Sequence, residues 1–299
     1  MPSKRHQTSS LLFPIRSASL IMVASHTVEG LEESPKADGK EISLVQSLQD
    51  LILVEFGKAG GEIGEMEYVT FKHITPEEEV YFGQSSKNKR EITMEEFNSA
   101  LQRLPDNEIF PEVPEDIPLT IAPDDLDDDS AFLKRPGLTS YDEDTKGTIF
   151  VRMATLQETV IMEQLSKEPH PYIIRYLGCR VRRGRITCIV LERLDRTLMQ
   201  YVNEPEFGKL DRSRFLKALE SAVAHVHALG LAHNDINPYN IMVKDGMPVL
   251  IDFGACQPLG LPLQERGTPG WSMDDITTSE LEHDAYGLRK IREWLESFE

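Results

Sequence analysis

The sequence predicts an α+β fold, because strand-like runs occur mainly in its first two thirds and helical patterns mainly in its last third. Three short runs rich in β-branched and aromatic residues are separated by turns that contain Gly or Pro, and they lie at 51–56, 67–71 and 79–83. Apolar residues recur at helical spacing over 212–229, between Asp211, which can cap a helix, and Gly230, which can end one.

The composition is that of a globular chain with a strong negative charge. Its 299 residues are 40% hydrophobic and 27% charged, so most of the chain can contribute to a sizeable core. A formal net charge of -18 argues against nucleic acid or an anionic membrane as a main partner. The basic run at 180–185 is a local exception, which we interpret as the solvated tip of a hairpin. No apolar run approaches the roughly 20 residues that span a bilayer, so we expect no membrane partner and a soluble protein.

Cysteine usage indicates a reducing compartment. The three cysteines, Cys179, Cys188 and Cys256, lack the spacing of a metal site and leave an odd thiol in any pairing. We therefore expect no disulfide and an intracellular location, in the cytoplasm or nucleus.

The first part of the chain divides into two segments. We interpret residues 1–40 as a disordered tail rather than a targeting peptide, because Pro14 and Arg16 interrupt its apolar stretch. Residues 41–110 predict an N-terminal extension with a small sheet and one helix. Thr93 and Glu96 have the spacing of a capping box, and one face of the helix they start carries Phe97, Leu101 and Leu104, before Pro105 ends it.

Three polar residues further along have the spacing of a phosphoryl-transfer site. Asp235 is followed five residues later by Asn240, and Asp252 follows after two short apolar runs that read as a hairpin with Gly246 in its turn. Such a hairpin brings the amide and the second carboxylate together. Phosphoryl transfer needs an aligned nucleophile and neutralised phosphates, and Mg²⁺ needs only one or two protein oxygens beside phosphate and water. Asn240 and Asp252 fit the metal positions, and Asp235 fits a base that accepts a hydroxyl proton.

This pattern resembles protein kinases, in which the same order and spacing supply a catalytic base, a metal-binding Asn and the Asp of Asp-Phe-Gly. The resemblance covers about residues 131–299 and is strongest over 225–254. It implies a bilobal fold with a small, mostly β upper lobe at 111–195 and a truncated helical lower lobe at 196–299. It also implies ATP and Mg²⁺ as cofactors and a protein as substrate.

Further site residues follow from the resemblance. Ala131-Phe132-Leu133-Lys134 resembles the strand whose Lys holds the α- and β-phosphates, and Glu158 on the next helix is its expected partner, in preference to Glu163. A competing alignment gives the role of Lys134 to Arg152, but only five residues then separate it from Glu158, too few for strand, turn and helix start.

The segment after the apolar run 186–191 resembles the kinase hinge, whose backbone holds adenine. Leu191 then corresponds to the gatekeeper, and Glu192 and Leu194 to hinge residues. Gly267-Thr268-Pro269-Gly270-Trp271 resembles the turn that binds the protein substrate, with Thr268 able to hydrogen-bond Asp235.

Several features depart from the kinase pattern. No Gly-rich phosphate loop precedes Lys134, and the acidic run at 124–129 reads as a solvated loop because the Gly and Glu of a Ca²⁺ loop are missing. Asn234 replaces the Arg that would bind an activation-loop phosphate, and Asn237 replaces the Lys that would neutralise the γ-phosphate. Among kinases, the sequence looks most like compact, divergent kinase-like proteins of filamentous fungi.

Three functions remain open on these residues. The leading one is an ATP-dependent Ser/Thr protein kinase. A catalytically weak pseudokinase that serves as a binding module is the second, and a small-molecule phosphotransferase is the third, because such enzymes also lack the Lys after the catalytic Asp.

Overall fold

The computed structural model describes residues 43–57, 66–126, 130–138, 141, 150–274 and 276–298. The predicted tail at 1–40 and part of the acidic run at 124–129 lie outside these residues. Among the described residues, no helix combines the length and apolar character needed to cross a membrane.

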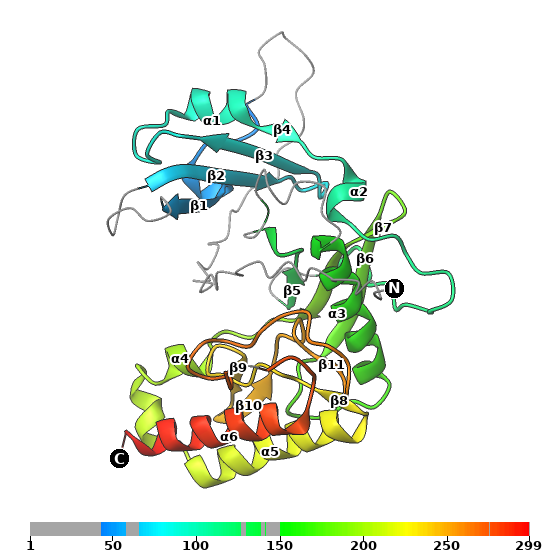
Figure 1. Cartoon of the computed structure of the whole chain (residues 1–299), viewed down its shortest axis with the longest axis vertical. Helices are drawn as coiled ribbons and strands as arrows, with labels where there is room; N and C mark the ends of the chain where they lie inside the picture. Colours follow the sequence, from blue (N-terminus) through cyan, green and yellow to red (C-terminus); the bar gives the residue numbers. More distant parts are fainter. Residues whose placement is uncertain are drawn as a thin grey trace, which may run out of the picture.

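The N-terminal extension forms a separate antiparallel sheet, at the top of the molecule in Figure 1. Its strands pair in chain order, and they are β1 (Ile52–Gly57), β2 (Met66–Ile74), β3 (Val80–Ser85) and β4 (Gln102–Arg103). A 3-10 helix, η1 (Leu48–Asp50), precedes the sheet, while helix α1 (Met94–Ala100) joins β3 to β4 and α2 (Asp106–Ile109) follows β4.

Helix α1 begins as the sequence predicts but ends earlier. Thr93 and Glu96 form a reciprocal capping box, which satisfies donors at the helix start. The helix ends at Ala100 rather than at Pro105, because Gln102 and Arg103 hydrogen-bond to β3 as strand β4. The three apolar residues expected on one helical face are all buried nonetheless, at Phe97, Leu101 and Leu104.

A second sheet follows, with strand order β5-β7-β6. Its strands are β5 (Ala131–Lys134), β6 (Tyr176–Arg182) and β7 (Arg185–Glu192), and helix α3 (Phe150–Ser166) packs beside it. The chain before β5 pairs with β6 through Ile121 and Cys179, at the edge of the sheet opposite β5. Within the described segments, this stretch therefore does not extend the sheet beside Lys134, where a phosphate loop would lie.

The lower part of the molecule is built around two long helices, α5 (Arg212–Ala228) and α6 (Leu281–Glu296) (Figure 1). Asp211 caps α5 as predicted, by accepting a hydrogen bond from the Arg214 backbone. Shorter elements complete this part, and they are α4 (Leu198–Tyr201), η3 (Pro205–Lys209), β8 (Leu231–Ala232), β9 (Ile241–Lys244), β10 (Met247–Leu250) and β11 (Gln257–Pro258).

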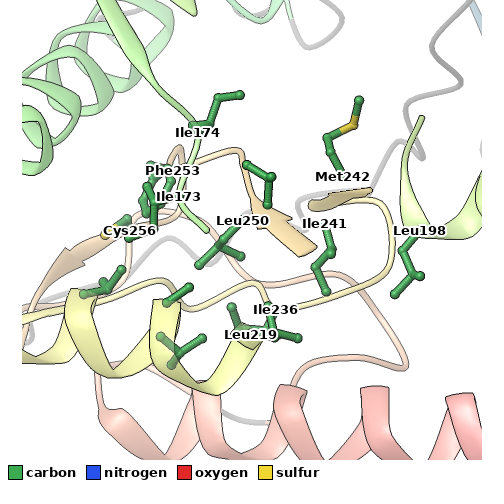
Figure 2. Packing of buried hydrophobic residues seen from close by; sticks show 14 of the residues in the cluster. Ile173, Ile174, Leu198, Leu219, Ile236, Ile241, Met242, Leu250, Phe253 and Cys256 are labelled. Atoms are coloured by element: carbon green, nitrogen blue, oxygen red, sulfur yellow. The ribbon is translucent and has the colours of Figure 1, made fainter. Parts of the chain in front are cut away.

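Apolar side chains from α5, α6 and the β9–β10 hairpin form one core beneath the polar site residues. Figure 2 shows Leu219 of α5 facing Ile236, Ile241 and Leu250, with Phe253 and Cys256 beside them. All six are buried. The loop at 233–240 and the segment after β10 therefore pack on this core, and the close packing limits how far their polar side chains can move.

The hairpin turn has the predicted backbone. Asp245 and Gly246 have φ angles of 52° and 70°, the two left-handed residues of the tight turn that suits a right-twisted hairpin. Asp tolerates this region better than most residues, and Gly adopts it without strain.

The basic run at 180–185 forms a hairpin tip as expected, with Arg183 and Gly184 exposed in the turn between β6 and β7, but its arginines also make contacts that we did not expect. The Arg180 guanidinium lies 3.0 Å from Oε1 of Glu78, and Arg183 donates hydrogen bonds of 2.9 and 3.0 Å to the backbone oxygens of Glu77 and Glu78. Arg183 also pairs with Asp106, at 2.5 Å. These arginines join the second sheet to the N-terminal extension. The sequence pattern alone could not indicate this, because Glu78 lies 102 residues before Arg180.

Candidate active site

The β9–β10 hairpin brings the two predicted metal ligands to adjacent positions. Asn240 precedes β9, Asp252 follows β10, and the Ile251 backbone donates a hydrogen bond of 3.0 Å to the Asn240 backbone oxygen. Asp252 has a φ of 62°, a left-handed conformation that is uncommon for a residue with a side chain. Such a backbone is typical of positions where the surrounding structure fixes a side chain for a purpose.

Asp235 is held by three donors around its carboxylate. The Thr268 backbone donates a hydrogen bond of 2.7 Å to Oδ1, the Thr268 hydroxyl donates one of 3.2 Å to Oδ2, and the Asn240 amide donates one of 2.8 Å to Oδ2. The structure thus places Thr268 against Asp235, as the sequence pattern indicated. The three donors fix the direction of the carboxylate without neutralising it with a cation.

Asn237 organises the loop around Asp235. Its amide oxygen accepts hydrogen bonds from the backbones of Tyr239 and Asn240, at 2.8 and 3.3 Å, and its nitrogen donates to the Thr268 hydroxyl at 3.1 Å. Sequence reasoning treated Asn237 only as a missing lysine. The Asn-Pro-Tyr-Asn sequence carries the missed signal, because an Asn side chain commonly accepts from the backbone two residues ahead.

Lys134 lies between two carboxylates. Its Nζ atom is 2.5 Å from Oε1 of Glu158 and 2.7 Å from Oδ1 of Asp252. The Phe253 backbone donates a further hydrogen bond of 3.1 Å to Glu158. The three predicted residues, 118 positions apart at the extremes, therefore meet in one cluster.

The charges of this cluster support one another. Burial lowers the pKa of the Lys134 ammonium, but the charges of Asp252 and Glu158 outweigh this effect and raise it above its usual range. Burial likewise raises the pKa of Asp252, but the Lys134 charge outweighs it and lowers that pKa below its usual range. Burial raises the pKa of Glu158 despite the neighbouring Lys134. A protonated lysine beside an ionised Asp252 results, as binding of phosphate and a cation requires.

The competing alignments do not fit the structure. Arg152 lies in the first turn of α3 and not on a strand, so it is not the counterpart of Lys134. Glu163, the other candidate on α3, accepts hydrogen bonds from Thr120 instead, at 2.8 Å from its backbone and 2.9 Å from its hydroxyl.

The predicted hinge follows β7. Leu191 is buried and pairs with Phe132 of β5, the strand that carries Lys134. The Glu192 side chain pairs with Lys244, at 2.8 Å, so it ties the hinge to the β9–β10 turn. Leu194 is half-buried and lines a cavity of about 460 Å³ together with Tyr201 and Val243.

Asn234 is buried and forms hydrogen bonds with several segments, so it does not occupy a phosphate-binding position. It has a φ of 64°, and its side-chain nitrogen donates hydrogen bonds of 3.0 Å to the Ala255 backbone oxygen and to the Ser279 hydroxyl. Nδ1 of His283 lies 3.1 Å from its amide oxygen. The catalytic-type loop, the segment after Asp252 and the start of α6 are therefore tied together by a neutral side chain.

Glu265 is a site residue that sequence reasoning missed. Burial raises its pKa, and the nearby carboxylates of Asp252, Glu158 and Asp235 raise it further, while Lys134 opposes them. Its carboxyl therefore lies near enough to these groups for their charges to act on it. Its sequence context, three residues before Thr268, carries no signal for this placement.

The donor set suits Mg²⁺ that is shared with phosphates. Asp252 offers the carboxylate oxygen that Lys134 does not use, and Asn240 offers its amide oxygen, which receives no hydrogen bond from the described residues. Oxygen ligands of this kind are those that Mg²⁺ prefers. The described part of the chain has no group of three or more His, Cys, Asp or Glu side chains that could hold a metal ion.

Comparison with known proteins agrees with this geometry. Residues 138–285 match the model of the protein kinase domain. This chain carries a protein kinase domain. The expected α+β, bilobal fold class is thereby confirmed. The matched residues include α3, β6, β7 and α5, whereas β5 lies just before them and α6 begins within them and continues beyond.

Several curated kinases resemble the chain over the same region. The serine/threonine-protein kinase/endoribonuclease IRE1 of Hypocrea jecorina is 31% identical over 147 residues, which cover 42% of this chain and 12% of that protein. Human serine/threonine-protein kinase/endoribonuclease IRE2 is 32% identical over 126 residues, or 36% of this chain and 13% of that protein. The liver/testis gamma catalytic chain of human phosphorylase b kinase is 30% identical over 145 residues, or 46% of this chain and 35% of that protein. The match therefore spans a minor part of each relative.

Proposed function

We propose that the protein is an ATP-dependent Ser/Thr protein kinase, which transfers the γ-phosphoryl group of ATP to a protein hydroxyl. The observation that carries this proposal is the joint arrangement of Lys134, Glu158 and Asp252, with Nζ of Lys134 within 2.7 Å of both carboxylates. An isolated ion pair would be explained by stability alone. Here the residue before Asp252 is hydrogen-bonded to Asn240, and Asn240 and Thr268 together orient a third carboxylate, Asp235, through three donors.

Asp235 acts as the base in this proposal. Its carboxylate accepts the proton of the substrate hydroxyl as the oxygen attacks the γ-phosphorus, and the bond to the leaving diphosphate breaks. Thr268 and Asn240 keep the carboxylate in one orientation. The entropic cost of aligning the base with the reacting hydroxyl is therefore lower. Thr268 also belongs to the turn that receives the protein substrate.

The nucleotide is held by the other residues of the site. Lys134 binds the α- and β-phosphates, and Glu158 fixes its direction. Leu191 closes the back of the adenine site, while the backbones of Glu192 and Leu194 hydrogen-bond the base. Asn240 and Asp252 would hold Mg²⁺, which neutralises phosphate charge when it is bound.

Two observations favour a second function. Asn237 places an amide, not a cation, beside Asp235, where the family pattern has a lysine. No Gly-rich loop precedes Lys134 in the sequence. Both features reduce stabilisation of the transferred phosphoryl group, as in a pseudokinase that binds nucleotide without rapid transfer.

Labelled ATP separates these functions. Purified protein is incubated with labelled ATP, Mg²⁺ and either a peptide library or a mixture of hydroxylated metabolites. Labelled peptides support the protein kinase. Labelled metabolites support the small-molecule phosphotransferase, and binding of ATP with neither product supports the pseudokinase.

Two variants of basic residues test the assignment of Lys134. Lys134→Met should abolish ATP binding or transfer while the fold persists, because Met preserves most of the packing of the lysine stem. Arg152→Met is the matched control and should be nearly silent, since Arg152 lies on α3 outside the cluster. Loss of activity in Arg152→Met together with an active Lys134→Met would contradict the assignment.

A further inference from the structure

Helix α3, which carries Glu158, is packed at its first turn against the N-terminal extension. Val151 of α3 belongs to a buried cluster, and most of its other side chains come from β3, the end of β4 and α2. The cluster comprises Val80, Phe82, Leu104, Ile109, Phe110, Leu138, Tyr141 and Val151. The Tyr141 hydroxyl also donates a hydrogen bond of 2.8 Å to Glu108. The start of α3 is therefore fixed by the extension sheet rather than by the kinase domain alone.

The other end of α3 is held by Glu163. This side chain is buried, with 7% of its surface exposed, and its two oxygens accept hydrogen bonds of 2.8 Å from the Thr120 backbone and 2.9 Å from the Thr120 hydroxyl. A buried carboxylate needs such donors, because an unpaired one is costly. Glu163 thus joins α3 to the chain that precedes β5.

That chain is itself fixed to strand β6. The Cys179 backbone donates a hydrogen bond of 2.8 Å to the Thr120 backbone oxygen, and the Ala122 backbone donates one of 2.9 Å to the Cys179 oxygen. The two segments approach so closely at Gly178 that a Cβ atom there would lie 2.6 Å from the Ala122 nitrogen. Thr120 therefore offers Glu163 a rigid anchor.

We propose that Glu163 and Thr120 are positioning residues that keep Glu158 directed at Lys134, and that the N-terminal extension is a built-in support for α3. This inference rests on the proposed function for its consequence in catalysis. Glu163 lies five residues after Glu158, so about 7.5 Å of helix axis separates the two positions. Because a helix moves as a unit over this length, a shift that frees Glu163 also shifts Glu158.

We call the two hydrogen bonds between Glu163 and Thr120 the clamp, and its loss should affect the pairing of Lys134. Without the two hydrogen bonds between Glu163 and Thr120, this end of α3 is no longer tied to the chain before β5, and α3 can rotate or move outward. Glu158 then leaves Lys134, which stays with Asp252. A lysine paired with only one of its two carboxylates is less well fixed for phosphates, so nucleotide affinity should fall.

The test measures α3 directly as well as nucleotide binding. Glu163→Ala removes both hydrogen bonds while it keeps a good helix former, and Thr120→Val removes only the hydroxyl bond. Met153→Ala is the control, at an exposed position of the same helix. In the full-length protein, Glu163→Ala should speed amide hydrogen exchange over 150–166 and weaken binding of Mg²⁺·ATP by about tenfold, which corresponds to about 1.4 kcal/mol. Thr120→Val should give a smaller change in both, and Met153→Ala none.

A double-mutant cycle separates positioning from general stability. In the Glu158→Gln background, Glu163→Ala should have little further effect on Mg²⁺·ATP binding, because Glu158 is the residue through which it acts. The proposal is overturned if exchange over 150–166 is unchanged in Glu163→Ala, or if the two substitutions weaken binding additively. Exchange at α3 does not require nucleotide or transfer. Faster exchange in a protein that transfers no phosphate would therefore support the clamp and count against the proposed function alone.

Discussion

Removal of the Glu78 carboxylate should undock the N-terminal extension from the kinase domain. The Glu78 side chain is 4% exposed, and its partner Arg180 is 13% exposed at 3.0 Å. The Thr187 hydroxyl donates a further hydrogen bond to Glu78. Glu78→Ala leaves the Arg180 guanidinium buried without its counter-charge, and loss of one partner of a buried pair typically costs about 3–5 kcal/mol. Glu78→Gln keeps the size and an acceptor, and should cost about 1.5–3 kcal/mol.

An exposed ion pair of the N-terminal extension provides the control. Lys89 and Glu55 lie 2.9 Å apart, with about 40% and 39% of their side chains exposed. Glu55→Gln should cost about 0–1 kcal/mol, because water already solvates both charges. Urea unfolding followed by circular dichroism measures the free energy of unfolding of each variant. The loss in free energy of unfolding should be larger for the buried pair than for the exposed pair. A free energy of unfolding for Glu78→Ala within about 1 kcal/mol of wild type would refute a buried pair of this strength.

Fluorescence locates the effect. The chain has two tryptophans, and both Trp271 and Trp294 pack against the core that α5, α6 and the β9–β10 hairpin form, away from the extension. Circular dichroism reports all of the secondary structure. If Glu78→Ala loosens only the extension, the transition seen by circular dichroism should move to lower urea while the fluorescence transition stays in place. Equal movement of both would mean that extension and kinase domain unfold together.

Two further predictions concern metal and pH. ATP with Mg²⁺ should stabilise the protein by about 2.7 kcal/mol at a hundredfold excess over the dissociation constant, and Asp252→Ala should lose that gain in a thermal-shift assay; equal stabilisation of both proteins by ATP with EDTA would contradict a metal at Asp252. Burial and the neighbouring His225 lower the pKa of His170, so the unfolded chain takes up this proton first as the pH falls. The stability due to His170 should therefore be complete above about pH 6.5 and lost below it, and His170→Gln should flatten the fall in melting temperature between about pH 7 and pH 5; parallel curves would show that His170 does not contribute.

Local spacing made much of the lower lobe predictable. Asp235 and Asn240 are five residues apart in one loop, and a short hairpin joins Asn240 to Asp252, so their meeting follows from a loop, a turn and two strands rather than from the whole fold. The cap at Asp211 and the turn at Gly246 are local in the same sense. The sequence carries such information because each piece needs only near neighbours to form.

Contacts between distant segments could not be predicted. Glu163 could be recognised as a possible partner of Lys134. Its contact with Thr120, however, depends on the chain before β5, which lies between β6 and α3. Helix α1 ends early because Arg103 pairs with β3. The helix propensity of the residues in this segment does not indicate that pairing. The contact between Glu78 and Arg180 likewise needs two sheets to be docked first. The position of the basic run at a hairpin turn was therefore predictable, but its contacts with the extension were not.

The buried cluster shared by the extension and α3 also constrains the order in which the protein can mature during synthesis. Val80, Phe82, Ile109 and Phe110 emerge from the ribosome before Val151, which completes the cluster. At about 5–20 residues per second, the 41 residues from Phe110 to Val151 take roughly 2–8 seconds to translate. Through that interval the extension sheet presents an unfinished apolar face, so nascent chains that pause between these positions expose the surface at which chaperones act and aggregation starts.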